Sequence, residues 1–251
     1  MSETALSTEN LVKKFGSVTA VDGVSVDIST DQVVGIIGPN GAGKTTFVNL
    51  VTGVLEATDG TVTFDGEDIT DVPEHGRVKR GLARSFQIPQ IYNELSTLEN
   101  VRAASIAREG KNNVFYRPLS RDPSTKEDAL DYLEHFDLGD QADVTAESLA
   151  HGDRKILDIA MSFALEPKMV LLDEPTSGVG SESTDEIMQT TVDVARQSDT
   201  GILFIEHDME LVARYADRVI ALHQGEVLSD GDPDDVLADE EVIEHIREEG
   251  A

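Results

Sequence analysis

The alternation of apolar and polar positions changes character twice along the chain. In the first 65 residues, short runs rich in Val and Ile are separated by turns that contain Gly, Asp and Asn, which is typical of β-strands. We expect these strands at residues 5–15, 21–28, 33–38 and 61–66. Residues 43–55 then show apolar positions at helical spacing, which predicts a helix directly after the third strand. These apolar positions are Phe47, Leu50, Val51 and Val54.

From about residue 89 to residue 150 the pattern becomes mostly helical. Residues 96–110 begin with Ser/Thr cap candidates, and residues 124–139 have a Ser/Thr-x-x-acid start and end at a glycine. The second of these helices carries Leu130, Leu133 and Phe136 on one face. We expect a polar loop between the two helices, at residues 110–124.

After a further helix at 153–167, strand-like runs alternate with helical stretches. The strands are expected at 168–175, 200–208 and 217–225. This alternation predicts a parallel α/β sheet, into which the helical region is inserted. The closing residues read as two short capped helices, starting at Asp232-Pro233 and at Asp239.

Length and composition exclude several classes of protein. The 251 residues allow one large domain or two small ones. Because the chain has no cysteine, disulfides, thiolate zinc sites and cysteine nucleophiles are excluded. No apolar run approaches the ~18 residues of a membrane span, and the first residues lack the pattern of a secretory signal. We therefore expect a cytoplasmic chain.

The charge is strongly negative. The chain has 49 Asp plus Glu against 20 Lys plus Arg, a formal net charge of −29. Such a surface repels phosphate backbones, so nucleic acid is not an expected partner. Two interpretations remain, a generally acidic soluble protein or a protein adapted to a salt-rich cytoplasm. We favour the second, because the acids are dispersed over well-patterned helices and strands rather than gathered in one tail.

The segment Gly38–Thr46, GPNGAGKTT, fits the pattern G-x-x-x-x-G-K-[ST] between a predicted strand and a predicted helix. Small residues let successive backbone N–H groups face a β-phosphate at a helix N-terminus, which already favours anions. Lys44 can reach the β- and γ-oxygens, and the Thr45 hydroxyl can join a Mg²⁺ shell. The candidate nucleotide-binding residues are Gly38, Pro39, Asn40, Gly41, Ala42, Gly43, Lys44, Thr45 and Thr46.

Three further candidates follow later strands. Asp173 and Glu174 end the apolar run at 168–175. In a phosphate-loop protein the first acid holds Mg²⁺ and the second can polarise the attacking water. His207 follows the next strand, whose carboxyl end should face the same crevice.

In this order of motifs, the chain resembles the ATP-binding subunits of ABC transporters over nearly all its length. The motifs are an early aromatic residue, GPNGAGKTT, RSFQIPQ, SLAHGDRK, VLLDEPTSG and IEHD. The resemblance implies a RecA-like P-loop NTPase core of parallel strands with an N-terminal antiparallel β subdomain. It implies one domain over 1–251, in which 1–88 and 151–251 form the core and 89–150 the helical subdomain.

The same resemblance implies roles for individual residues. Phe15 stacks on adenine, although read alone it could equally be a core residue. Gln87 contacts Mg²⁺ and water and signals to the membrane partner. Glu174 is the catalytic base, and His207 contacts the γ-phosphate.

Members of this family sandwich two ATP molecules in a dimer, each between one phosphate loop and the partner's signature turn. Here that turn is LAHGD in place of the usual Leu-Ser-Gly-Gly-Gln. Its residues are Leu149, Ala150, His151, Gly152 and Asp153.

Four positions depart from the family pattern. Ala150 lacks a hydroxyl that is worth about 1–3 kcal/mol of anion binding. His151 replaces a glycine, and Asp153 brings a negative charge close to a phosphate. Gly180 replaces an Asp or Asn that helps link the two ATP sites, which leaves their coupling open.

Several segments are similar to one subgroup, the ATP-binding subunits of branched-chain amino-acid importers. RSFQIP and IEHDM are the most specific of them. The resemblance implies two permease subunits, reached through Gln87 and the helical region, with IPQIYNEL (88–95) as the candidate contact surface. It also implies a substrate-binding protein, an indirect partner, and a place on the cytoplasmic face of the membrane. A homodimer and a heterodimer with a sister subunit both fit.

Three alternatives stay open at this stage. The cargo could be urea or short amides, because importers of these share much of the same pattern. The chain could be a regulatory subunit that hydrolyses ATP poorly, given Ala150, Asp153 and Gly180. It could also be an ABC ATPase of DNA repair or translation, although those proteins usually carry two ATPase units in one chain and bind nucleic acid.

Overall fold

A six-stranded sheet runs through the centre of the molecule. The computed structural model describes residues 4–85, 90–108 and 123–247. The sheet has the order β10-β9-β3-β8-β7-β6, parallel except for β10, which pairs antiparallel with β9 at the edge. Its strands are β3 (Val33–Ile37), β6 (Leu82–Ser85), β7 (Met169–Asp173), β8 (Gly201–Ile205), β9 (Arg218–His223) and β10 (Glu226–Gly231). All residues of β3, β7 and β8 are buried, as expected for parallel strands covered on both faces.

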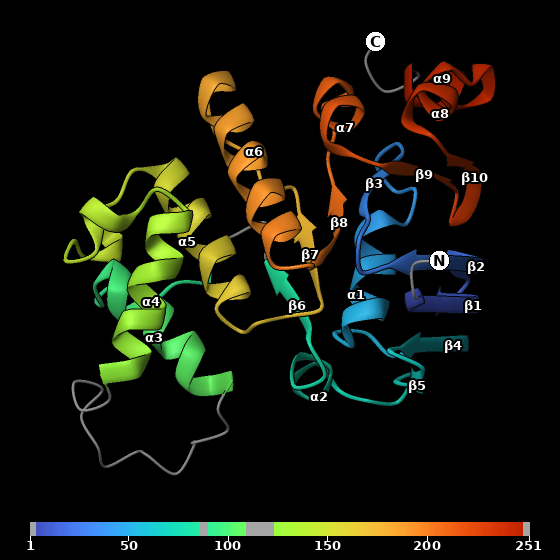
Figure 1. The fold of residues 1–251 in the computed structure, drawn as a ribbon. Coiled ribbons are helices and arrows are strands. Elements are labelled where there is room, and N and C mark those ends of the chain that lie inside the picture. Colours follow the sequence, from blue (N-terminus) through green and yellow to red (C-terminus); the bar gives the residue numbers. More distant parts are fainter. Residues whose placement is uncertain (1–3, 86–89, 109–122, 248–251) are drawn as a thin grey trace.

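A smaller antiparallel sheet with the order β2-β1-β4-β5 lies beside the first (Figure 1). Its strands are β1 (Thr4–Phe15), β2 (Val18–Ser29), β4 (Asp59–Phe64) and β5 (Glu67–Asp68). One hydrophobic core joins the two sheets through α1 (Lys44–Thr52), whose Phe47, Leu50 and Val51 are buried in it. The helix after the phosphate loop is therefore held between two sheets.

Most of the remaining helices form a second core on the other face of the large sheet. They are α3 (Thr97–Arg108), α4 (Pro123–His135), α5 (His151–Phe163), α6 (Ser181–Gln197), α7 (Met209–Tyr215), α8 (Pro233–Ala238) and α9 (Glu240–Arg247). The short helix α2 (Glu74–Val78) instead bonds to the end of α1 through its buried Arg77. Figure 1 shows α3, α4 and α5 grouped on the side away from the small sheet. The α5 helix contacts α3 and α4 as well as β6 and β7, so it connects this helical group to the core.

The predicted architecture is confirmed, with local differences. The expected strands and helices are present, including helices at Asp232-Pro233 and after Asp239. The placing of Val54 on the first helix is wrong, because α1 ends at Thr52, its C-cap residue Gly53 is in a left-handed conformation, and Val54 is exposed. The short elements β5, β6 and α2 and the edge strand β10 were not anticipated. Most of the predicted loop at 110–124 lies outside the described residues.

Candidate functional site

The phosphate loop is fixed by two glycines that no other residue could replace. Gly38 has φ 147°, and a Cβ there would lie 2.1 Å from the carbonyl oxygen of Leu222. Gly43 has φ 100°, and its Cβ would lie 2.3 Å from the carbonyl oxygen of Ala20. Both approaches are too close for any side chain. The glycines therefore let the loop lie against the strands behind it, in addition to giving the loop its turn.

A cavity of about 340 Å³ opens in front of this loop. It brings together residues from five separate stretches of the sequence, and its position is the one expected at the carboxyl ends of parallel strands. The lining residues are Phe15, Ala20, Asn40, Gly41, Ala42, Gly43, Lys44, Thr45, Thr46, Glu174 and His207. Gly43, the N-cap residue of α1, has no side chain that could cap the helix, and the helix dipole favours an anion at this end.

Lys44 lies in this cavity with its ammonium held by the loop. Its Nζ donates to the carbonyl oxygens of Gly38 at 2.6 Å and Pro39 at 2.9 Å, and the side chain is buried. Thr45, the next residue, is exposed. The loop therefore presents one cation and the hydroxyl-bearing residues Thr45 and Thr46 to a ligand at the helix terminus.

Phe15 lies at the outer edge of the cavity. It is 49% exposed, which rules out the core reading of this residue. The Nζ of Lys13 lies 5.3 Å from the centre of its ring. An exposed ring face beside a phosphate loop can stack on a base, so the assignment to adenine stays a prediction that this position supports.

Glu174 and His207 face each other across the cavity. Glu174 Oε1 lies 3.1 Å from His207 Nε2. Glu174 has φ 49°, an uncommon conformation for a residue other than glycine, and its N–H donates to the carbonyl oxygen of Ile205. The structure thus brings together two residues that lie 33 positions apart in the chain. The sequence predicts that both take part in ATP hydrolysis.

Asp173 is buried and paired with an arginine that the sequence analysis did not single out. The Nη2 of Arg84 donates to Asp173 Oδ2 at 2.8 Å, and both side chains are less than 10% exposed. The Nη1 of the same guanidinium donates to Asn49 Oδ1 on α1. Arg84 therefore connects the acid at the end of β7 to the phosphate-loop helix.

A buried carboxylate that the sequence analysis did not single out, Glu206, organises the loop after Glu174. Glu206 is buried, and its Oε1 accepts from both the backbone N–H and the hydroxyl of Thr176, at 3.0 and 2.7 Å. Burial raises the pKa of Glu206, while the bonds from Thr176 oppose this effect. Because Glu206 precedes His207, this contact ties the loop 174–180 to the strand that positions the histidine.

The signature residues lie at the start of α5, with Ala150 as its N-cap residue and no side-chain cap. Leu149 is buried, whereas Ala150 and His151 are exposed. The His151 ring lies close to Gly178, where a Cβ would be 3.2 Å from Nε2.

Lys155, one turn further along α5, donates to the carbonyl oxygen of Glu174 and to Ser177 Oγ. Burial lowers the pKa of Lys155, and the surrounding acids counteract this effect.

The turn at 149–153 contributes none of the residues described as lining the phosphate-loop cavity. Gly152 and Asp153 are partly buried at the start of α5, and Gly180 is the exposed N-cap residue of α6. Gln87 lies outside the described residues.

The residues of the cavity, together with Asp173 at the end of β7, fit ATP and Mg²⁺, although Asp173 is not among the residues described as lining the cavity. The Thr45 hydroxyl and the Asp173 carboxylate are hard oxygen donors, which Mg²⁺ prefers, and Mg²⁺ commonly takes its other ligands from phosphate and water. Lys44 and the open N-terminus of α1 match a polyphosphate. Thr45 and Asp173 can therefore supply two oxygen ligands to the metal of a bound nucleotide, whereas Gln87, the other predicted ligand, lies outside the described residues.

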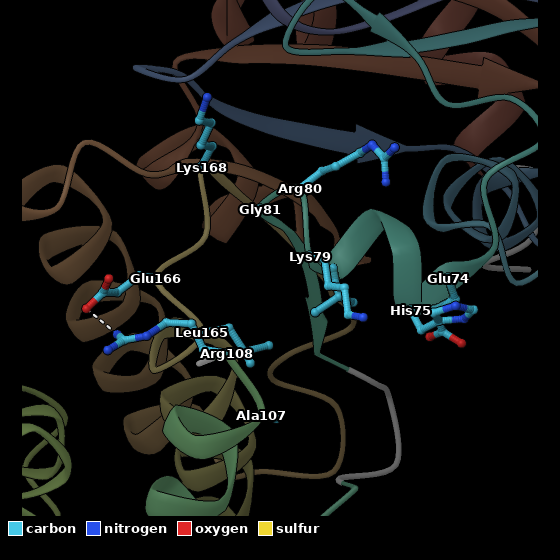
Figure 2. Close-up of a pocket in the computed structure, with 11 residues that line it drawn as sticks. Glu74, His75, Lys79, Arg80, Gly81, Ala107, Arg108, Leu165, Glu166 and Lys168 are labelled. Carbon is cyan, nitrogen blue, oxygen red and sulfur yellow. Dashed lines mark ion pairs between the residues drawn. The ribbon is translucent and has the colours of Figure 1, made fainter. Parts of the chain in front are cut away.

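Two further cavities adjoin each other beside the helical group. The larger, about 600 Å³, carries Glu74 and His75 on one wall and the Arg108–Glu166 ion pair on the other (Figure 2). The smaller, about 290 Å³, is lined by α3, α5 and the residues on either side of 86–89. Val78, Ala107 and Leu165 line both. Exposed Tyr92, from the predicted contact surface, lies at the smaller cavity, whereas Ile91 is partly buried against the core.

Across the part of the chain that is described, the helices are too short or too polar to cross a membrane.

Comparisons with known proteins agree on one family. The model of the family described as ABC transporter matches residues 21–177. The high-affinity branched-chain amino acid transport ATP-binding protein BraF of Pseudomonas aeruginosa is 34% identical over 250 residues, covering 97% of each chain. A solved ATP-binding cassette of an ABC transporter, in its ADP conformation, has a TM-score of 0.87 and 33% identity over 98% of this chain and 99% of its own. A dimeric cassette bound to ADP and Pi has a TM-score of 0.76 and 25% identity, covering 91% of this chain and 98% of its own.

Proposed function

Since this chain belongs to the ABC transporter family of ATP-binding proteins, we propose that it is the ATP-hydrolysing subunit that powers import of branched-chain amino acids. One observation carries the ATPase assignment: Lys44, Glu174 and His207 line one cavity around the open N-terminus of α1. The cargo assignment rests on relatives such as BraF, which matches nearly the whole chain.

ATP binds in the cavity of about 340 Å³. The N–H groups at the start of α1 and the ammonium of Lys44 receive the phosphates, and Phe15 stacks on the adenine. Thr45 and Asp173, with Gln87, would hold Mg²⁺, which would supply positive charge to offset that of the phosphates. Arg84 pairs with both Asp173 and Asn49 on α1, which holds the carboxylate in place.

Glu174 accepts a proton from the attacking water, and His207 contacts the γ-phosphate. Their separation of 3.1 Å lets the imidazole orient the carboxylate before the nucleotide arrives. The bonds from Thr176 to Glu206 hold the loop after Glu174 against β8. The Glu174 carboxylate is therefore held in a fixed position relative to the attacking water. Such positioning is a major part of what a protein contributes to phosphoryl transfer.

The signature turn acts on the ATP of a second subunit. It does not line the cavity of its own chain, and its helix starts with an uncapped N-terminus that can face an anion. Two copies of this chain, or this chain and a sister subunit, close over two ATP molecules, and hydrolysis reopens them. The dimeric relative bound to ADP and Pi supports this arrangement.

Two permease subunits dock beside the helical group. The adjoining cavities at α2, α3 and α5 lie next to the ends of the segment that contains Gln87, and Tyr92 is exposed there. A substrate-binding protein then contacts the permeases rather than this chain. The chain works at the cytoplasmic face of the membrane, and its dispersed negative charge suits a salt-rich cytoplasm.

The ATPase proposal is tested by measuring ATP hydrolysis by the purified chain in molar KCl at increasing protein concentration. We expect a rate that rises roughly as the square of the concentration, because two copies must assemble each working site. Binding of ATP without turnover would contradict self-assembly and favour a sister subunit or a regulatory role.

The cargo is tested by uptake of labelled leucine and labelled urea in cells that lack this subunit. We expect leucine uptake to fall and urea uptake to stay constant. Leucine uptake that survives the loss would overturn the proposed cargo.

A further inference from the structure

Helix α5 carries a carboxylate on its buried side. Asp158 is 5% exposed, between Leu157 and Ile159, which are buried in the core. A buried ionisable group is costly unless hydrogen bonds compensate for its lost hydration. Neither the phosphate loop nor the catalytic pair uses this residue.

The two carboxylate oxygens of Asp158 hold two points of the chain. Oδ2 accepts from the hydroxyl of Ser85 at 2.6 Å, and Oδ1 accepts from the backbone N–H of Gln90 at 2.8 Å. Ser85 is the last residue of β6, and Gln90 follows five positions later. One side chain on α5 therefore fixes both ends of the stretch that contains Gln87.

Polar contacts continue from this point to the ATP site. Arg84, the neighbour of Ser85, binds Asp173 and Asn49 through its guanidinium. Ser162, one turn after Asp158, donates to the carbonyl oxygen of Arg84 at 3.2 Å. The end of β6 is thus bonded to α5 on one side and to the residues around the nucleotide on the other.

The signature turn lies on the same helix. Its His151 precedes Asp158 by seven residues, which is about 10 Å along a helix axis and close to the same face. A stiff helix carries any displacement at Asp158 to that turn. A misplacement of about 1 Å can cost as much as 100-fold in rate when a group must meet a reacting centre.

We propose that Asp158 is a positioning residue that holds the signature turn at one place relative to the ATP-binding core. This inference rests on the proposed function, because only a half-site presented to a partner's ATP requires that fixed place. Two bonds from separate points restrict both the shift and the rotation of α5 on β6. The same bonds make α5 and the ends of the Gln87 stretch move together.

The test compares Asp158→Asn and Ser85→Ala with a matched control, Ser105→Ala. Asparagine keeps the size of the side chain but offers one acceptor oxygen in place of two. Ser105 is a buried serine on α3 whose hydroxyl donates within its own helix, to the carbonyl oxygen of Val101. The control therefore removes a buried hydroxyl without touching the contact between α5 and β6.

The position of the helical group is read directly by pulsed electron paramagnetic resonance. Because the chain has no cysteine, Glu134→Cys on α4 and Glu226→Cys on β10 accept one spin label each, and both positions are exposed. In nucleotide-free protein we expect one narrow distance for the parental chain and for Ser105→Ala. We expect a broadened distribution of this distance for Asp158→Asn and Ser85→Ala. Both variants should still unfold well above the assay temperature, so that the broadening does not come from unfolding.

ATP turnover is measured on the same unlabelled variants. We expect a loss of about tenfold for Asp158→Asn and parental turnover for Ser105→Ala. The proposal would be overturned if the distribution of label-to-label distances kept its width in both Asp158→Asn and Ser85→Ala, or if it broadened while ATP turnover stayed parental. Equal broadening in the control Ser105→Ala would also overturn it. The width is measured without ATP, so a parental chain that fails to hydrolyse ATP counts against the proposed function alone.

Discussion

At the scale of single residues, the catalytic assignment depends on Glu174. Its carboxylate lies 3.1 Å from His207 Nε2, and its backbone is held at φ 49° by a bond to β8. Glu174→Gln keeps these contacts within reach but removes the proton acceptor. We expect ATP hydrolysis to fall about 10²–10⁴-fold, because a general base contributes that much.

The same variant should retain ATP and trap the dimer, which size-exclusion chromatography with ATP and Mg²⁺ detects. Glu210→Gln, an exposed acid on α7, serves as the control and should hydrolyse ATP normally. Parental turnover in Glu174→Gln would refute the assignment of the base.

Ala150 tests the identification of the signature turn. It is the N-cap residue of α5 and offers no side-chain acceptor to the helix. Ala150→Ser supplies a hydroxyl that can cap α5, so we expect the free energy of unfolding to rise by about 0.5–2 kcal/mol. ATP hydrolysis should stay the same or increase modestly, because serine is usual at this place. Collapse of hydrolysis in a folded variant would show that LAHGD does not face a γ-phosphate.

At the scale of elements, the sequence predicted those whose apolar period is long enough to recognise. The strands β3, β7 and β8 read as continuous apolar runs because they are covered on both faces. The β6 strand was missed, because it has only four residues and two of them, Arg84 and Ser85, have polar side chains that do not indicate a largely buried strand. The end of α1 does carry a local signal, the left-handed Gly53, which the helical spacing of Val54 concealed.

In the candidate site too, some residues could be predicted from the sequence and others could not. The phosphate loop, Glu174 and His207, which line one cavity, could be predicted to lie together, because each directly follows a strand. The contacts of Asp158 and Glu206 could not be predicted, because their partners lie 73 and 30 positions away. The only sequence signal for them is an acid within an apolar stretch, and this signal does not name a partner.

One contact between elements makes a direct prediction. Arg77, at the end of α2, donates to the carbonyl oxygens of Leu50 and Val51 at the end of α1, and to those of Thr70 and Val72. Burial lowers the pKa of Arg77 to about 10, so the guanidinium remains charged at neutral pH. Arg77→Lys replaces a fork of donors with a single ammonium, and we expect a loss of about 2–4 kcal/mol in the free energy of unfolding.

Urea unfolding measures this change. Arg80→Lys is the matched control, because Arg80 is exposed and pairs with Glu67 on the surface, where an ion pair contributes at most about 1 kcal/mol. Equal losses in the two variants would mean that the carbonyl oxygens at the end of α1 do not need Arg77.

At the scale of the whole molecule, the net charge of −29 is the dominant feature. Dispersed acids repel one another across the surface and oppose compaction of the chain. Salt shortens the range of this repulsion, from about 10 Å at 0.1 M to about 3 Å at 1 M. We therefore expect the free energy of unfolding, measured in urea, to increase from 0.1 to 2 M KCl.

A variant with fewer charges separates this screening from general salt effects on hydrophobic burial. Glu94→Gln, Asp131→Asn, Asp143→Asn and Glu244→Gln together remove four exposed acids. If repulsion is the cause, this variant is more stable than the parent at 0.1 M KCl, and the two converge at 2 M. If salt acts only by strengthening hydrophobic burial, the free energy of unfolding increases equally for both chains at every KCl concentration. A parental stability that stays constant or falls with KCl would contradict adaptation to a salt-rich cytoplasm, and the acidic surface would then serve solubility only.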